Sequence, residues 1–301
     1  MIEPRSTAFA PAPRFAWPNG KRCAVVLCFD VDGETTAFSE SDRHAASVTL
    51  LSQCRYGPTV GVPRLLGLLS HLGVTGSFFV PAWIAEKYPR TIHGIAENGH
   101  EIAAHGYRHE KLPTLARAQE EEILLRSREI LQRVSGLAIT GYRAPWFEHN
   151  PWTTELLAQH NFLYDASLMD DDVPYRTPSG LIELPHNWML EDWEQFAFHG
   201  DPPLGHPPED CGKVRELWWR EFEAMRDFGC CMLLTLHPWL SGRPSRVRML
   251  EDLIRDMKAG GDVWFATAGE VARYFAANPQ ARREINFELL TPAGRSRHGQ
   301  S

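Results

Sequence analysis

The sequence lacks the features that mark membrane proteins and disulfide-rich secreted proteins. Its longest apolar runs, residues 23–29 and 230–236, are far shorter than the ~20 residues that cross a bilayer. No C-x-x-C spacing occurs among the six cysteines, and the N-terminal stretch has no apolar segment of the kind that a secretory leader carries. We therefore expect a cytoplasmic protein with reduced thiols and no membrane partner.

The chain also lacks an excess of positive charge. Its 31 Lys and Arg are outnumbered by 38 Asp and Glu, which gives a formal net charge of −7, and no basic stripe with interleaved aromatics occurs. Because nucleic acids and anionic membranes are bound mainly through Lys and Arg, the composition argues against both as partners. The hydrophobic content of 43% over 301 residues is ordinary for a soluble globular protein with room for one α/β barrel.

No low-complexity block, repeat or linker divides the middle of the chain. We expect one domain over residues 22–276, preceded by a Pro- and Ala-rich arm at 1–21 and followed by a polar tail at 277–301. Strand-like and helix-like stretches alternate, which is typical of a parallel sheet with crossover helices. The predicted fold is a closed or distorted (β/α) barrel of about seven or eight units, with its chemistry at the carboxyl ends of the strands.

The elements of this predicted barrel follow from short apolar runs and from amphipathic stretches. The expected strands are 23–29, 74–80, 101–104, 141–143, 163–165, 181–184, 232–236 and 263–266. The expected helices are 62–71, 84–88, 115–135, 153–160, 214–228, 246–258 and 268–276. The segment 34–57 is expected to be a loop.

Candidate metal ligands follow two of these strands. Asp30 and Asp32 come after the first strand, and acids two residues apart on a strand point to the same face. His105 and His109 come after the third, and histidines four residues apart on one helical turn would project from the same side. Asp32 with both histidines would give three protein ligands and an open position, the arrangement of a catalytic zinc site. The alternative is that Asp32 only shapes a turn.

Polar residues after other strands complete a candidate catalytic set. Asp30 is the candidate general base for a metal-activated water. Arg143 could hold that carboxylate in a fixed orientation. His237 is the candidate general acid for a departing nitrogen, and Asp165 is the carboxylate expected to orient it. The alternatives are a buried Asp tied to a cation and a structural histidine at a strand end.

Aromatic residues follow the same strand ends. Trp146 comes after Pro145, which stiffens the turn, and Trp188 comes shortly before Asp192. Aromatic side chains with a few polar groups suit the wall of a small-molecule pocket. We therefore expect these four residues to bind substrate, although packing alone would also explain the tryptophans.

Taken in order, these motifs resemble those of the polysaccharide deacetylase (NodB-homology) superfamily over about residues 22–275. The FDVDG motif is similar to the family's base and metal aspartates, HGYRH to its metal-binding histidines, YRAPW to its arginine–proline motif, and LTLHP to the motif with the acid histidine. The resemblance implies a distorted (β/α) barrel that hydrolyses carbon–nitrogen bonds of N-acetyl sugars or related amides, with zinc or another divalent metal.

Within that superfamily the chain looks like an intracellular branch of cyclic imide hydrolases, metal-independent allantoinases and a peptidoglycan deacetylase group. Allantoinases depart at the metal aspartate, whereas this chain keeps Asp32, so the resemblance implies a bound metal. The loop 34–57 and the Trp-rich segment 188–193 could cover a closed pocket, so we favour a small cyclic imide or amide as substrate. The alternatives are an N-acetylglucosamine or peptidoglycan deacetylase and a non-catalytic carbohydrate-binding relative. By analogy we expect a homo-oligomer such as a tetramer, with subunit contacts through 1–21 and 34–57.

Overall fold

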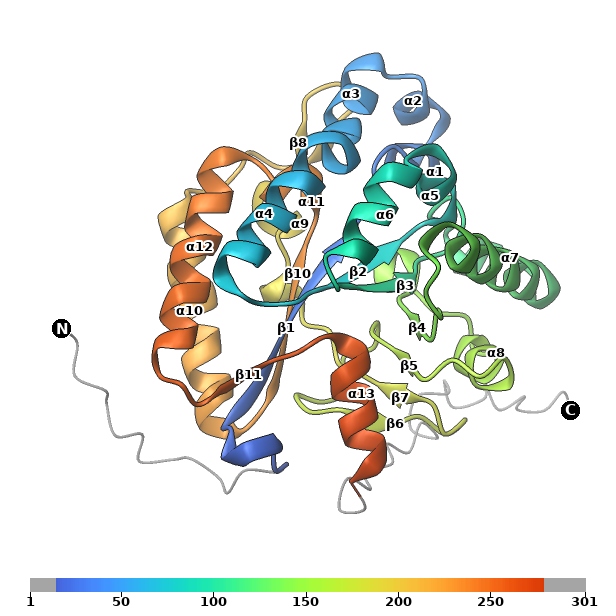
Figure 1. Ribbon diagram of the computed structural model, residues 1–301. Coiled ribbons are helices and arrows are strands. Elements are labelled where there is room, and N and C mark those ends of the chain that lie inside the picture. Colours follow the sequence, from blue (N-terminus) through green and yellow to red (C-terminus); the bar gives the residue numbers. More distant parts are fainter. Residues whose placement is uncertain (1–14, 279–301) are drawn as a thin grey trace, which may run out of the picture.

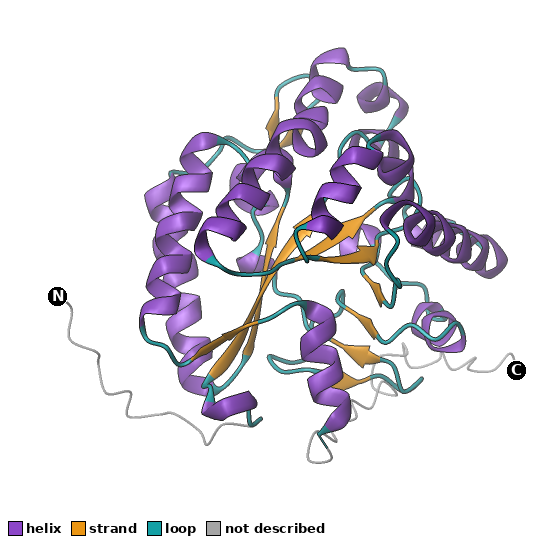
Figure 2. Ribbon diagram, viewed as in Figure 1, coloured by secondary structure: helices purple, strands orange, loops and turns teal. Residues whose placement is uncertain are grey.

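The strands form one curled sheet and one small hairpin in a computed structural model that describes residues 15–278 (Figures 1 and 2). The strands are β1 (Cys23–Asp30), β2 (Ser77–Val80), β3 (Glu101–Ala104), β4 (Gly141–Tyr142), β5 (Tyr164–Asp165), β6 (Tyr175–Arg176), β7 (Ile182–Glu183), β8 (Phe198–His199), β9 (Leu204–Gly205), β10 (Cys231–Leu236) and β11 (Val263–Phe265). Residues 1–14 of the predicted arm and 279–301 of the predicted tail lie outside the described residues.

The large sheet has the hydrogen-bonded order β10-β1-β2-β3-β4-β5-β7-β6. β11 pairs with the first residues of β1, and β2 pairs with its last residues. Every pairing is parallel except that of β6 with β7, and β8 pairs with β9 apart from this sheet. β10 and β6 stand at the two ends of this order and do not pair within the described residues, so the sheet does not close on itself. The predicted barrel-like fold is confirmed, in the form of a curled, open half-barrel.

Helices connect and cover these strands. They are α1 (Thr35–Glu40), α2 (Asp42–Ala45), α3 (Val48–Tyr56), α4 (Val62–Leu72), α5 (Ala82–Lys87), α6 (Pro89–Glu97), α7 (Arg117–Ser135), α8 (Thr153–Gln159), α9 (Trp193–Phe196), α10 (Cys211–Phe228), α11 (Pro238–Ser241), α12 (Pro244–Ala259) and α13 (Ala268–Ala277). Single turns occur at η1 (Pro18–Gly20), η2 (Gly57–Gly61), η3 (Leu112–Thr114), η4 (Pro145–Phe147) and η5 (Trp188–Leu190). None of the helices in the described part has the length and hydrophobicity of a membrane span.

The sheet has a hydrophobic core on each face. All residues of β1 are buried, and successive side chains of a strand point to opposite faces. Val25 and Leu27 join the cluster that includes residues of α4, α10 and α12, which lie together in Figure 1. Val26 and Cys28 join the cluster that includes Phe275 of α13. This double burial explains why β1 has no polar alternation before Asp30.

Two longer stretches of the predicted element pattern were wrong, and the short elements β6, β8, β9, α9 and α11 were not predicted. The segment 34–57, expected to be a loop, contains α1, α2 and α3, because Ser41 and Ser47 cap helices with their hydroxyl groups instead of marking turns. α6 was not predicted, since Pro89 suggests a break. Pro89 stands in the first turn of that helix, where the missing N–H costs nothing.

Candidate active site

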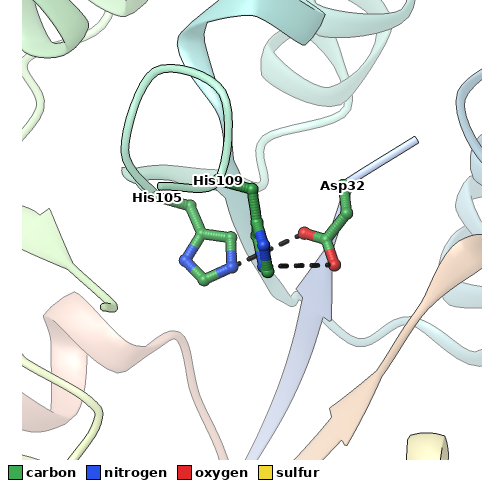
Figure 3. A group of neighbouring side chains, drawn as sticks. All are labelled: Asp32, His105 and His109. Carbon is green, nitrogen blue, oxygen red and sulfur yellow. Dashed lines mark ion pairs between the residues drawn. The ribbon is translucent and has the colours of Figure 1, made fainter. Parts of the chain in front are cut away.

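Asp32, His105 and His109 meet beyond the carboxyl ends of β1 and β3. One ligand atom from each lies within 4.8 Å of the others. His105 Nε2 is 3.5 Å from Asp32 Oδ1, and His109 Nε2 is 3.7 Å from Asp32 Oδ2. Figure 3 shows both imidazole rings beside the carboxylate. All three residues are buried, so the cluster is part of the interior and not a chance surface grouping.

The two histidines are not on a helix, which corrects the geometry expected from their spacing. They lie in a loop in which Gly106 and His109 have positive φ values of 70° and 62°. A right-handed helix needs negative φ, and only glycine adopts the positive region without strain. The Glu110 carboxylate fixes the loop by accepting hydrogen bonds from the backbone N–H groups of Tyr107 and Arg108. The loop brings the two rings together by a path that the i, i+4 spacing did not predict.

The residues of this cluster fit a divalent cation. Asp32 Oδ1 is buried and has no hydrogen-bond partner among the described residues, which is costly for a carboxylate unless a cation compensates it. Burial and the charges of His105 and His237 hold the pKa of His109 well below its usual value, so its imidazole is neutral, the form that binds metal. The Arg143 carbonyl lies 2.8 Å from His105 Nδ1 and orients that ring. One carboxylate and two imidazoles suit zinc.

Asp30 is held by Arg143, as the sequence predicted. Arg143 Nη1 donates to Asp30 Oδ1 at 2.7 Å, and Arg143 Nε donates to the Ala166 carbonyl at 3.0 Å. Both side chains are buried. Burial alone would lower the pKa of Arg143, but the Asp30 carboxylate keeps that pKa above its usual value. The guanidinium is therefore a fixed positive charge behind the candidate base, whose catalytic role stays a prediction.

His237 pairs with Asp192, not with Asp165. Asp192 Oδ1 is 2.7 Å from His237 Nδ1, and both Asp192 oxygens accept the His237 backbone N–H at 2.9 Å. Ser241 Oγ also donates to Asp192. Burial alone would lower the pKa of His237, but the hydrogen bond and charge of Asp192, with the charge of Asp32, raise it to about 10. Asp192, predicted to bind substrate, is instead fully buried behind the histidine.

The prediction that Asp165 orients His237 is wrong. Asp165 Oδ2 lies 3.1 Å from His149 Nε2, and Asp165 Oδ1 accepts a hydrogen bond from Ser167. Asp165 ends β5, which is several strands from β10 in the sheet order. Asp192 reaches His237 because the residue before it forms a parallel bridge with Thr235 of β10. The adjacent acids Glu191 and Asp192 in the segment PHNWMLEDW were the sequence signal for a partner of His237, and the prediction did not use them.

A cavity of about 180 Å³ opens over the cluster. Its lining residues are Asp30, Asp32, Thr36, His105, His109, Trp146, Phe147, Trp188, Glu191, Trp193, Glu194 and His237. Trp146 and Trp188 thus lie where the sequence predicted. Pro145 does not line the cavity: it is buried and packs beside Gly106 of the histidine loop. Trp146 adopts a positive φ of 61° and packs against the His109 ring at a centroid distance of 5.1 Å.

Known proteins are similar to this chain in both sequence and fold. The Polysaccharide deacetylase family profile matches residues 55–164. A peptidoglycan deacetylase from Helicobacter pylori is 31% identical over 265 residues, which cover 77% of this chain and 89% of that protein. The chain belongs to the polysaccharide deacetylase family. The predicted family is therefore confirmed, and the protein is a hydrolase of non-peptide carbon–nitrogen bonds.

Solved structures of related proteins support the half-barrel. A crystal structure from Mycobacterium smegmatis, assigned as a polysaccharide deacetylase, has 44% identity and a TM-score of 0.87, and covers 92% of this chain and 98% of its own. The crystal structure of an allantoinase has 23% identity and a TM-score of 0.78, covers 93% and 99% of the two chains, and shares the fold. Deacetylases of this family are metal-dependent, and the three-residue cluster is present here.

Proposed function

We propose that the protein uses a divalent cation, zinc, held by Asp32, His105 and His109, to hydrolyse an amide bond of a small cyclic imide or amide in the cytoplasm. The size of the cavity carries this proposal. Sites for drug-sized ligands measure about 300–1,000 Å³, whereas this cavity measures about 180 Å³ and has four aromatic residues in its lining. A small ring suits this space better than an extended glycan chain.

The side chains around the cavity supply the proton transfers that such a hydrolysis needs. The cation, when bound, would polarise the scissile carbonyl and make a water molecule more acidic. Asp30, positioned by Arg143, accepts a proton from the attacking water. His237, kept protonated by Asp192, donates its Nε2 proton to the departing nitrogen as the carbon–nitrogen bond breaks. Water thus adds across that bond, and the ring opens to a carboxylate and an amide.

A second candidate function is deacetylation of N-acetylglucosamine-containing glycans. It is supported by the name of the Helicobacter pylori relative, a peptidoglycan deacetylase. Trp188, with 44% of its surface exposed, lies among the lining residues and could contact a longer chain. The limits of the catalytic domain at 22–276 and a homo-oligomeric assembly stay predictions from the sequence.

The metal content and the substrate preference test this proposal on one sample. We expect about one divalent ion per chain by mass spectrometry, and ring opening of succinimide, maleimide or allantoin that chelation abolishes. His105→Ala should lose both metal and activity, whereas His71→Ala, an exposed histidine on α4, should lose neither. Asp30→Asn should keep the metal and lower kcat by about 10²–10⁴-fold.

Three outcomes would contradict the proposal in different ways. Metal with activity only on chitin oligomers would favour the deacetylase. Absence of metal under replete conditions would remove the metal site altogether. Full activity of Asp30→Asn would show that another group is the base.

A further inference from the structure

A further buried acid, Glu191, lies in the cavity wall beside Asp30 and Asp32 and takes no part in the proton transfers above. Glu191 is only 3% exposed, and it belongs to the cavity lining. Its Oε1 lies 3.9 Å from His237 Nε2, and its Oε2 lies 3.3 Å from His186 Nε2. The Oε2 atom is buried and forms no hydrogen bond within the described residues. The nearest polar neighbour of Oε2 is His186 Nε2, which also forms no hydrogen bond within the described residues. Because a carboxyl oxygen has two lone pairs, one of them remains for a ligand in the cavity even with His186 beside it.

The backbone holds Glu191 at this place. Glu191 bridges Thr235 of β10, and the N–H of the next residue donates to the Thr235 carbonyl at 3.1 Å. The strand that carries His237 therefore also positions Glu191, so the two side chains face the same region of the cavity. His186 stacks on Phe147, with ring centroids 3.8 Å apart, and closes the wall behind Glu191.

The surroundings of Glu191 favour its neutral form near pH 7. Burial raises the pKa of its carboxyl group to about 8; the charge of His237 opposes this shift and that of Asp30 adds to it. His186 brings no compensating positive charge, since burial holds its pKa well below the usual value. A neutral carboxyl group offers an O–H donor and a carbonyl acceptor side by side.

We infer that Glu191 determines substrate class by binding the edge of a cis amide, in which the N–H and a carbonyl oxygen point to the same side. A cyclic imide or lactam presents such an edge because the ring forces the amide to be cis. The amide of an N-acetyl sugar is trans, so its N–H and carbonyl oxygen point in opposite directions and cannot both reach one carboxyl group. This inference rests on the proposed function.

The position of Glu191 agrees with this role in the proposed reaction. In an imide, one carbonyl is attacked while the nitrogen and the second carbonyl remain beside each other. Glu191 and His237 are near enough to flank that nitrogen from two sides. Glu191 would then hold the N–H and the second carbonyl while His237 protonates the nitrogen, which aligns the ring without adding a chemical step.

The test compares two Glu191 variants on three probes: succinimide, N-methylsuccinimide and the chitin trimer. Glu191→Met, of similar length but apolar, should lower kcat/KM for succinimide by about 10- to 100-fold and reduce the preference over N-methylsuccinimide. Glu191→Gln also carries a donor beside an acceptor and should stay within about fivefold of the wild type. Glu122→Met, the same change on the exposed face of α7, is the control for which no loss is expected.

Four outcomes would overturn the inference. Equal kcat/KM of the wild type for succinimide and N-methylsuccinimide would do so even if no variant folded. Unchanged selectivity in Glu191→Met, with succinimide still opened, would remove the role of Glu191 and leave the proposed function intact. Equal losses in Glu191→Gln and Glu191→Met would exclude recognition through a donor–acceptor edge. A wild type that deacetylates the trimer but opens no ring would remove the proposed function itself.

Discussion

Besides the Asp32 cluster, two aspartate–histidine pairs with buried carboxylates lie near strand ends of the same sheet, yet only one of them contributes a residue to the cavity lining. In the first, Asp192 contacts the His237 ring and backbone N–H and also accepts from Ser241. In the second, Asp165 lies 3.1 Å from the His149 ring and accepts a hydrogen bond from Ser167. His237 lines the cavity and His149 does not. Asp192 therefore holds its histidine through both the ring and the backbone, whereas the contact of Asp165 with its histidine within the described residues is with the ring.

The surroundings of the second pair indicate a structural role. Burial alone would raise the pKa of Asp165, but the charge of His149, 3.1 Å away, lowers it. The neighbouring Glu183 has a pKa well above its usual value because of burial and the Asp165 charge. Glu183 accepts the backbone N–H groups of Ser167 and Leu168, so these acids stabilise the turn after β5. The comparison teaches that residue type and strand-end position do not by themselves identify a catalytic pair.

Replacing each histidine in turn with alanine should give the largest difference in activity between the two pairs. His237→Ala should lower kcat for ring opening by about 10²–10⁴-fold, since the leaving nitrogen loses its proton donor. His149→Ala should change kcat by less than about threefold, because that ring lies outside the cavity. Steady-state kinetics on both purified variants measure this difference. Similar losses in the two variants would show that both pairs serve the reaction.

Replacing Asp192 should have a smaller effect on turnover and a pH-dependent effect on stability. The pKa of His237 is about 10 in the fold against 6.5 ordinarily, so its protonation stabilises the protein fully below pH 6.5, and the stabilisation is lost as the pH rises through about 10. In metal-free protein, Asp192→Asn should reduce the free energy of unfolding by about 3–5 kcal/mol at pH 6. The reduction should shrink toward pH 10, as urea titrations at both pH values can measure. A loss of unfolding free energy that is the same at both pH values would show that protonation of His237 is not the source of the stabilisation.

Replacing Asp165 should have the smallest effect on activity. Asp165→Asn should leave kcat within about twofold but reduce the free energy of unfolding by about 1–3 kcal/mol at pH 7. Because the pKa of Asp165 is lowered from 3.8, this contribution is present above pH 3.8 and disappears as the pH falls through the folded value. Asp252→Asn, on the exposed face of α12, is the matched control. A large loss of turnover with unchanged stability would restore Asp165 as a catalytic residue.

Particular elements show which parts of the fold could be predicted. β1 and β10 were evident because strands buried on both faces read as continuous apolar runs. α6 and the helices of 34–57 were missed because a proline in the first turn and capping serines resemble turn signals when only the sequence is seen. The alternation of strands and helices predicted a curled, mostly parallel sheet. It did not predict that the sheet stays open between β10 and β6.

The sequence by itself determined which polar residues follow the buried strands, and the cluster of Asp32, His105 and His109 with the Asp30–Arg143 pair followed from that. Only the tertiary structure decided the partner of His237 and the place of Glu191. The physical reason is that spacing along a strand determines where a side chain emerges, while contacts between distant segments depend on which strands become neighbours. Here one bridge to Thr235 brings Asp192 beside His237 and Glu191 to the cavity wall.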